Sequence, residues 1–399
     1  MLPVQLAENV HWVGVNDRTT GLFEGIWPIE REGVTYNAYL IQDEKTALID
    51  PVRISKVQLL LEKINAVSDI SEIDYIILNH MEQDHTSSLE VLRGLMPEVT
   101  IVGTEKTKAM LEGFYGITEN VRVVEDEETL SLGQTELRFF STPFIHWPET
   151  MMTYDPGREI LFSGDGFGIF GALRGGLFDD EVEEMGFYES EGLRYFANVV
   201  AKYSRPVQKV LERFSDLSPR MVAPSHGLVW REDPGRIMEL YGRWAGYAGG
   251  PAEPEVTVVY GSMYGFTERM MSAVAQGITE AGMPVEIFDA GRVHPSYILS
   301  SLLKRTGVVV AAPTYEGELF PPVARVLRLA GTKMTKGRRM ALVGSHGWRG
   351  GAFREVKELV EPLKWEAVEE MEFRGKPTAE DLRAGRDLGR RLAGQVGEG

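Results

Sequence analysis

The sequence predicts an α/β protein of two domains: two sheets packed face to face between helices, followed by a doubly wound parallel sheet. A chain of 399 residues exceeds what one hydrophobic core usually organises. Strands and helices are mixed irregularly in the first part, whereas they alternate regularly in the last part. Between the two, Ala248 to Pro254 lacks apolar periodicity and contains glycines and prolines that break helices and strands. We therefore predict domains at 1–250 and 254–399, joined by this linker.

The first domain shows short β-branched or aromatic runs that are typical of strands, interrupted by segments with helical spacing. Strands are expected at Val34–Ile41, Thr46–Asp50, Val121–Val124, Glu136–Phe140 and Glu159–Phe162. Helical spacing occurs at Leu89, Leu92 and Met96, and a longer helical segment is expected near Leu193–Phe214. This mixed order predicts a sandwich of two sheets covered by helices, an αββα arrangement.

The second domain repeats a strand followed by a helix. Strands are expected at Val256–Tyr260, Val285–Phe288, Val308–Ala312, Met340–Gly344 and, less regularly, Trp365–Phe373. One helix is predicted from Thr267 to Ala281, with Gly282 as its C-terminal stop. Repeated βα units indicate an open parallel sheet with its ligand at the carboxyl ends of the strands.

The composition disfavours several kinds of partner and excludes several kinds of metal site. A formal net charge of −17 disfavours nucleic acid and anionic membrane surfaces as partners. No segment approaches the roughly 20 continuous apolar residues of a membrane span, so we expect a soluble, cytoplasmic protein. The absence of cysteine excludes disulfides, cysteine-bound zinc and iron–sulfur clusters. Any metal must therefore be held by His, Asp and Glu, and the chain has only seven histidines.

One segment concentrates potential metal ligands. His80, Glu82, Asp84 and His85 follow the apolar run Tyr75–Leu78 directly and precede a predicted helix. Because they lie where a strand ends, they can converge on one cavity and serve two adjacent metals. The alternative is that these side chains only cap the helix.

Three more candidates follow short apolar runs and are flanked by Gly, Pro or Ser: His146, Asp165 and His226. Taken singly, each could equally be a loop residue that makes hydrogen bonds and binds no metal. As an ordered set with the first segment, they resemble the metallo-β-lactamase superfamily, and specifically its flavodiiron protein branch. Hydrolytic members usually have His at the position of Glu82 and bind zinc. The resemblance implies one iron on His80, Glu82 and His146, a second on Asp84, His85 and His226, and Asp165 as the bridge.

Three loops of the second domain resemble the FMN loops of flavodoxins. The first opens a helix with backbone N–H groups and hydroxyls, which suits a phosphate; the other two offer Tyr315 and Trp348 beside an aromatic ligand. Tyr264 departs from the commonest flavodoxin loop, which has a small hydroxyl residue there. The predicted FMN contacts are Ser262, Met263, Tyr264, Gly265, Phe266, Thr267, Pro313, Thr314, Tyr315, Glu316, Gly317, Ser345, His346, Gly347, Trp348, Gly350 and Gly351. No fingerprint of a nicotinamide site is present.

The resemblance covers essentially the whole chain and implies a function. It implies a metallo-β-lactamase-like domain with a diiron centre and a flavodoxin-like domain with FMN, which together reduce dioxygen to water or nitric oxide to nitrous oxide. It also implies an external donor, such as rubredoxin or a reduced deazaflavin, and a head-to-tail homodimer or a dimer of dimers. Tyr195 resembles a family tyrosine that hydrogen-bonds near the iron site, with a half-buried helix aromatic as the alternative.

Two other functions stay open at this point. The chain could be a zinc hydrolase of the lactamase type fused to a flavodoxin-like domain, although Glu82 argues against that. It could also be an electron carrier whose first domain has lost its activity, although the complete set of seven ligand residues argues against that.

Overall fold

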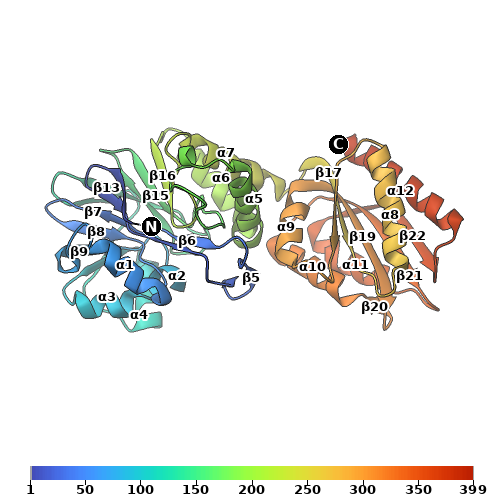
Figure 1. The fold of residues 1–399 in the computed structure, drawn as a ribbon, viewed down its shortest axis with the longest axis horizontal. Helices are drawn as coiled ribbons and strands as arrows, with labels where there is room; N and C mark the ends of the chain where they lie inside the picture. Colours follow the sequence, from blue (N-terminus) through green and yellow to red (C-terminus); the bar gives the residue numbers. More distant parts are fainter. Residues whose placement is uncertain (1, 399) are drawn as a thin grey trace. The chain divides into compact units, whose positions relative to one another are not determined.

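The computed structural model describes residues 2–398, which form two compact units (Figure 1). Among the described residues, the first unit contains 2–195 and 205–242, and the second contains 196–204 and 243–398. A short segment from the middle of the chain thus belongs with the C-terminal half. The predicted domain limits, 1–250 and 254–399, stay a prediction.

The first unit is built on two sheets. The seven-stranded sheet within its described residues has the order β1 (Val4–Ala7), β2 (Val10–Trp12), β7 (Tyr39–Ile41), β8 (Thr46–Ile49), β9 (Ile73–Ile77), β10 (Thr100–Gly103) and β11 (Val121–Val123). The five-stranded sheet has the order β12 (Thr129–Ser131), β13 (Glu136–Ser141), β14 (Met151–Asp155), β15 (Ile160–Gly164) and β16 (Met221–Pro224). Two small ribbons pair β3 (Val15–Asp17) with β6 (Val34–Tyr36) and β4 (Leu22–Phe23) with β5 (Trp27–Pro28).

Helices cover both sides of these sheets, which confirms the predicted αββα sandwich (Figure 1). On one side lie α1 (Val57–Ile64), α2 (Gln83–Thr86), α3 (Leu89–Leu95) and α4 (Glu105–Tyr115). On the other side lie α5 (Met185–Tyr195), α6 (Ser204–Arg213) and α7 (Pro234–Tyr247). Strands such as β14 and β15 are buried along their whole length, because the other sheet covers one face of their sheet and helices cover the opposite face.

The second unit is the predicted doubly wound parallel sheet. Its strands run in the order β18 (Val285–Asp289), β17 (Glu253–Tyr260), β19 (Arg305–Tyr315), β21 (Arg339–His346) and β22 (Glu366–Arg374), and the short β20 (Glu318–Leu319) pairs antiparallel with β19. Its helices are α8 (Phe266–Glu280), α9 (Pro295–Lys304), α10 (Pro321–Lys333), α11 (Ala352–Val360) and α12 (Ala379–Gly397).

Two sequence-based expectations differ from the structure. The predicted strand Val34–Ile41 divides into β6 and β7, because the backbone of Asn37 bonds to Ser225 and that of Ala38 to Val13 instead of continuing one ladder. The predicted helix Leu193–Phe214 is interrupted after α5 by a π-helical turn at Phe196–Val200, before α6 begins at Ser204. A π-helical turn shifts the direction of the side chains that follow it.

None of the helices described between residues 2 and 398 combines the length and the apolar character needed to cross a membrane.

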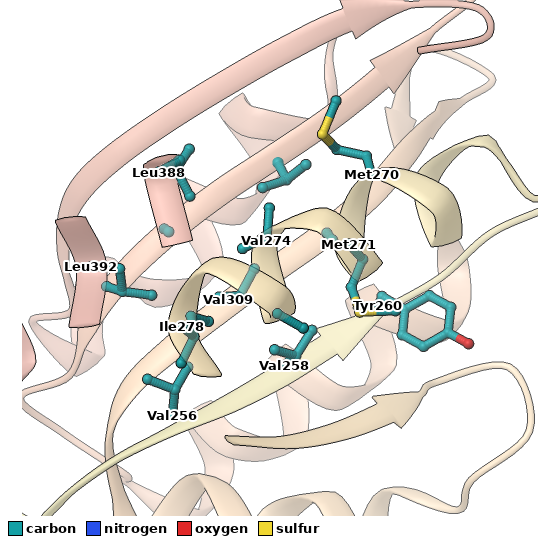
Figure 2. Close-up of a cluster of buried hydrophobic side chains, with 14 of the residues drawn as sticks. Val256, Val258, Tyr260, Met270, Met271, Val274, Ile278, Val309, Leu388 and Leu392 are labelled. Atoms are coloured by element: carbon teal, nitrogen blue, oxygen red, sulfur yellow. The ribbon is translucent and has the colours of Figure 1, made fainter. Parts of the chain in front are cut away.

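Glycines allow α8 and α12 to approach closely over the core of the second unit. Figure 2 shows Val274 and Ile278 of α8 between the leucines of α12 and the valines of β17. A Cβ atom on Gly389 would lie 2.1 Å from the carbonyl oxygen of Val274, and one on Gly277 would lie 1.8 Å from that of Arg386. The backbones occupy the space in which a side chain would stand.

Replacing Gly389 by alanine is therefore expected to destabilise the protein by about 1–3 kcal/mol, because the helices must move apart. The thermal unfolding midpoint of the full chain, followed by circular dichroism, measures the effect. Gly394→Ala is the matched control on the same helix, since a Cβ there meets no atom within 4 Å. Equal unfolding midpoints for the two variants would show that the close approach is unimportant.

Candidate functional site

The seven predicted metal-ligating side chains meet at one edge of the first unit. Asp165 follows β15 directly and His226 follows β16 by two residues, so the five-stranded sheet supplies both. His80 lies beyond the end of β9 in the other sheet, and His146 lies in the loop between β13 and β14. Strand ends from two sheets thus bring together residues that are up to 146 positions apart, from position 80 to position 226.

The side chains form two groups, each of which could hold one metal ion. The first group is His80, Glu82, His146 and Asp165, and the second is Asp84, His85 and His226. Within each group, the potential ligand atoms all lie within 4.8 Å of one another. These are the same two sets that the family resemblance implies, with Asp165 placed in the first.

Asp165 faces both groups, with one carboxylate oxygen toward each. Its Oδ2 lies 3.3 Å from His146 Nε2 and 3.8 Å from His80 Nε2. Its Oδ1 lies 2.9 Å from His85 Nε2 and 3.3 Å from His226 Nε2. A carboxylate in this position can bridge two cations.

Buried polar atoms at the centre of the cluster fit metal ions as their partners. Both oxygens of Asp84, Oδ1 of Asp165, and Nε2 of His85 and of His226 are buried, and within the described chain none makes a hydrogen bond of acceptable geometry, although Asp165 Oδ1 lies 2.9 Å from His85 Nε2. Unpaired buried polar atoms are rare because each loses its hydration without compensation. Their convergence on shared points gives a donor set of imidazoles and carboxylates, which suits iron as well as zinc or manganese.

Neighbouring groups hold the ligand side chains in place. Tyr195 is fully buried, and its hydroxyl donates a hydrogen bond of 2.9 Å to Asp165 Oδ2, so the alternative of a half-buried helix aromatic is wrong. His226 Nδ1 lies 2.6 Å from the carbonyl oxygen of Thr35. Glu149, which the sequence analysis did not single out, lies 2.8 Å from His80 Nδ1 through its Oε1 atom.

The carboxylates make the imidazoles of the metal-free cluster basic. Burial opposes the charged form, but Asp165 and Glu82 outweigh it and raise the pKa of His146 to about 9. Burial likewise opposes charge on His226, yet Asp165 and Asp84 raise its pKa to about 10. Conversely, the imidazoles of His146 and His80 outweigh burial at Glu82 and lower its pKa to about 2. Protons therefore occupy the cluster where cations would bind.

A second candidate site is a cavity of about 690 Å³ in the C-terminal unit. It lies at the carboxyl ends of β17, β19 and β21, where a doubly wound sheet binds its ligand. The predicted loops line it, apart from Gly265, Gly350 and Gly351. These glycines shape the loops instead: Gly265 has a φ of 83° before α8, and a Cβ on Gly351 would lie 2.2 Å from the oxygen of Gly317.

The cavity combines hydroxyls, aromatic rings and one cation. Thr267 and Ser345 bond to each other through their hydroxyls at 2.8 Å, at the start of α8. Tyr315 and Trp348 have exposed fractions of 43% and 91%, so their rings are available to a planar ligand. Arg349 and Gly375 also line the cavity and were missed. Gly375 directly follows β22, so it could have been predicted from the rule that a doubly wound sheet binds its ligand at the carboxyl ends of its strands.

Known proteins resemble the chain along its whole length. Residues 34–227 match the model of the ODP family beta lactamase, and residues 258–389 match the flavodoxin model. A nitric oxide reductase from Moorella thermoacetica is 32% identical over 404 residues, which cover 99% of each chain. The chain belongs to the flavodiiron protein family. Among solved structures, the flavodiiron protein of Giardia intestinalis has a TM-score of 0.94 at 29% identity, covering 100% of this chain and 97% of that one. Rubredoxin oxygen:oxidoreductase from Desulfovibrio gigas also has a TM-score of 0.94, at 26% identity and 99% coverage of both chains.

Membership of the flavodiiron family agrees with the fold predicted for both domains. The capping alternative for the first ligand segment is wrong, because Glu82 immediately precedes α2 and makes no side-chain cap there. The carboxylate of Glu82 instead lies 3.2 Å from His146 Nε2. In this flavodiiron protein, the segment thus serves the cluster and not the helix.

Metal binding to this cluster is expected to release protons. Since the pKa values of His146 and His226 lie at about 9 and 10, both imidazoles are protonated at pH 7 and must lose their protons to bind a cation. Because the pKa of His80 is also raised well above its ordinary value, loading metal-free protein with Fe(II) at pH 7 should release at least two protons per chain, and the affinity should rise with pH up to about 10.

Anaerobic calorimetry in two buffers that differ in ionisation enthalpy measures the release. His346→Ala, outside the cluster, should release the same number of protons. Fe(II) binding at pH 7 without proton release would contradict the account.

Proposed function

We propose that this chain reduces nitric oxide to nitrous oxide, or dioxygen to water, at two iron ions held by the seven clustered side chains, with electrons that enter through FMN in the C-terminal cavity. The observation that carries the proposal is the pair of ligand groups joined by Asp165. The relatives named nitric oxide reductase and rubredoxin oxygen:oxidoreductase support both gases as substrates.

Charge favours two divalent ions over an empty cluster. The four imidazoles bind metal in the neutral form, so Glu82, Asp84 and Asp165 contribute three negative charges. Two ferrous ions would bring four positive charges, which leaves one positive charge for a nearby anion to neutralise. Such a nearly neutral, buried assembly avoids the cost of isolated charges in a medium of low polarity.

The cofactors determine the class of reaction. Reduced FMN would supply two electrons and the two ferrous ions together would supply two more. The total is enough to reduce dioxygen to water or to couple two nitric oxide molecules. The protein positions them. Asp165 holds both ligand groups in register, and the Tyr195 hydroxyl fixes the orientation of its Oδ2. The rings of Phe23 and Phe170 exclude water, since Phe23 packs edge-on to His226 at 5.2 Å and to Phe170 at 5.2 Å.

The features that support FMN in the C-terminal cavity are the hydroxyls and N–H groups at the start of α8, which suit a phosphate, and the two exposed rings, which suit the flavin. An external donor is proposed to reduce the flavin, since these 399 residues contain no cysteine for an iron–sulfur relay. Rubredoxin or a reduced deazaflavin is the proposed donor. A head-to-tail homodimer, or a dimer of dimers, is proposed on the family resemblance.

The alternative of a zinc hydrolase is not favoured. The relatives that match the full chain are named nitric oxide reductase and rubredoxin oxygen:oxidoreductase. In addition, Glu82 offers an anionic oxygen in the first group, where hydrolytic members usually have an imidazole. An anionic oxygen ligand stabilises a metal that changes its charge during turnover, which zinc does not do.

Replacing Asp165 by asparagine tests the proposal, since it removes the charge that both ligand groups share. Protein is reduced chemically without air, iron and FMN are quantified in the same sample, and the consumption of each gas is measured. The native protein should consume at least one gas, and Asp165→Asn should be slower by at least roughly 100-fold while retaining FMN.

Asp216→Asn makes the same change at an exposed position and should leave the rate unchanged. Native protein that carries iron and FMN yet consumes neither gas would refute the proposal.

A further inference from the structure

Glu149 is a buried carboxylate that lies just outside the ligand groups. It is 1% exposed and stands between the His146 loop and β14. Its Oε1 accepts a hydrogen bond of 2.9 Å from the Met81 N–H and lies 2.8 Å from His80 Nδ1. Its Oε2 is buried, and among residues 2–398 it has no hydrogen-bond partner. A carboxylate in such a place requires positive charge nearby.

The contact between Glu149 Oε1 and His80 Nδ1 determines which nitrogen of His80 is available to a metal. Oε1 already accepts from Met81, so it acts as an acceptor and His80 Nδ1 carries the proton. Nε2 is then the nitrogen that can bind a metal ion once it has lost its proton. It points into the first ligand group, 3.3 Å from Glu82 Oε2 and 3.8 Å from Asp165 Oδ2. A carboxylate on the far nitrogen of a metal-binding histidine fixes the ring and makes it a stronger ligand.

The second ligand group lacks an equivalent carboxylate contact among the described residues. His226 Nδ1 meets the carbonyl oxygen of Thr35, which fixes the ring in the same way but is neutral. His85 Nδ1 is buried and has no hydrogen-bond partner in the described part of the chain. With Asp165 shared, the first group has Glu82 and Glu149 beside it, and the second has Asp84 within it and the buried Asp50 near His85. Within residues 2–398, the two groups therefore differ in one contact: only in the first does a carboxylate meet the far nitrogen of a ligand histidine.

We propose that Glu149 is a positioning residue that orients His80 and makes the two metal positions unequal. The inference rests on the proposed diiron function. The position at His80 binds its ion more tightly because of Glu149, and it favours the ferric state more strongly than the position at His226, because extra negative charge stabilises the higher charge of the metal.

Two variants separate charge from orientation. Glu149→Ala removes both, whereas Glu149→Gln keeps an oxygen that can accept from His80 Nδ1 and removes only the charge. The binding of Fe(II) to metal-free protein should resolve two affinities. In Glu149→Ala one of them should weaken by roughly 10- to 100-fold, and in Glu149→Gln the loss should be smaller. Asp155→Asn, which removes a different buried carboxylate at the far end of β14, is the control and should change neither affinity.

Mössbauer spectra of the iron-loaded protein distinguish a role at one metal position from a general role in folding, because loss of a purely structural residue would not change the signal of one iron selectively. In both variants, one of two iron signals should change, and in partly oxidised Glu149→Gln the preference for ferric iron at one position should diminish. Unchanged signals and affinities in Glu149→Ala would overturn the inference. So would an equal weakening of both affinities, because that indicates general damage to the unit.

Co(II), followed by its visible absorption, makes the test independent of gas reduction. A selective loss of one Co(II) position in the variants supports the role of Glu149 even if the iron-loaded native protein reduces neither gas, in which case only the proposed function fails. Equal Co(II) binding by the native protein and Glu149→Ala overturns the role of Glu149 while the proposed function stands.

Discussion

The arrangement of the first unit depends on one electrostatic constraint: four imidazoles and three carboxylates must share a small space away from water. The group is not satisfied by its own hydrogen bonds, because several of its buried oxygens and nitrogens lie close together without making one. Two cations resolve the conflict, and protons resolve it only in part by charging the histidines. The same constraint explains why Asp165 presents one oxygen to each group.

The fold meets this constraint by using strand ends from two sheets. Side chains at the ends of β9, β15 and β16 are fixed by ladders that are buried along most of their length, so the ligand atoms are positioned before any metal arrives. Aromatic packing around His226 and the hydroxyl of Tyr195 add rigidity. The C-terminal unit uses a parallel sheet in a similar way, since its cavity is formed by loops that follow adjacent strands.

Much of this was predictable from the sequence because local patterns and fold rules agree. Period-two and helical spacing predicted the elements, and the family resemblance carried by the ordered series from His80 to His226 implied which side chains would meet. The π-helical turn after Tyr195 was not predictable, because four of its five residues are apolar and the run fits an ordinary helix equally well. Glu149 was missed for a different reason: a single Glu beside a proline carries no motif, and its partner His80 is 69 positions away. Contacts across sheets of that kind are set by tertiary packing.

The most direct test of the central claim is an anaerobic reductive titration of the purified chain with dithionite, in which flavin absorbance and iron oxidation state are followed together. The account predicts an uptake of roughly four electrons per chain, about half by FMN and half by a pair of irons that Mössbauer spectroscopy detects. An uptake of roughly two electrons by flavin alone, in protein whose clustered histidines bind no redox-active metal, would contradict it.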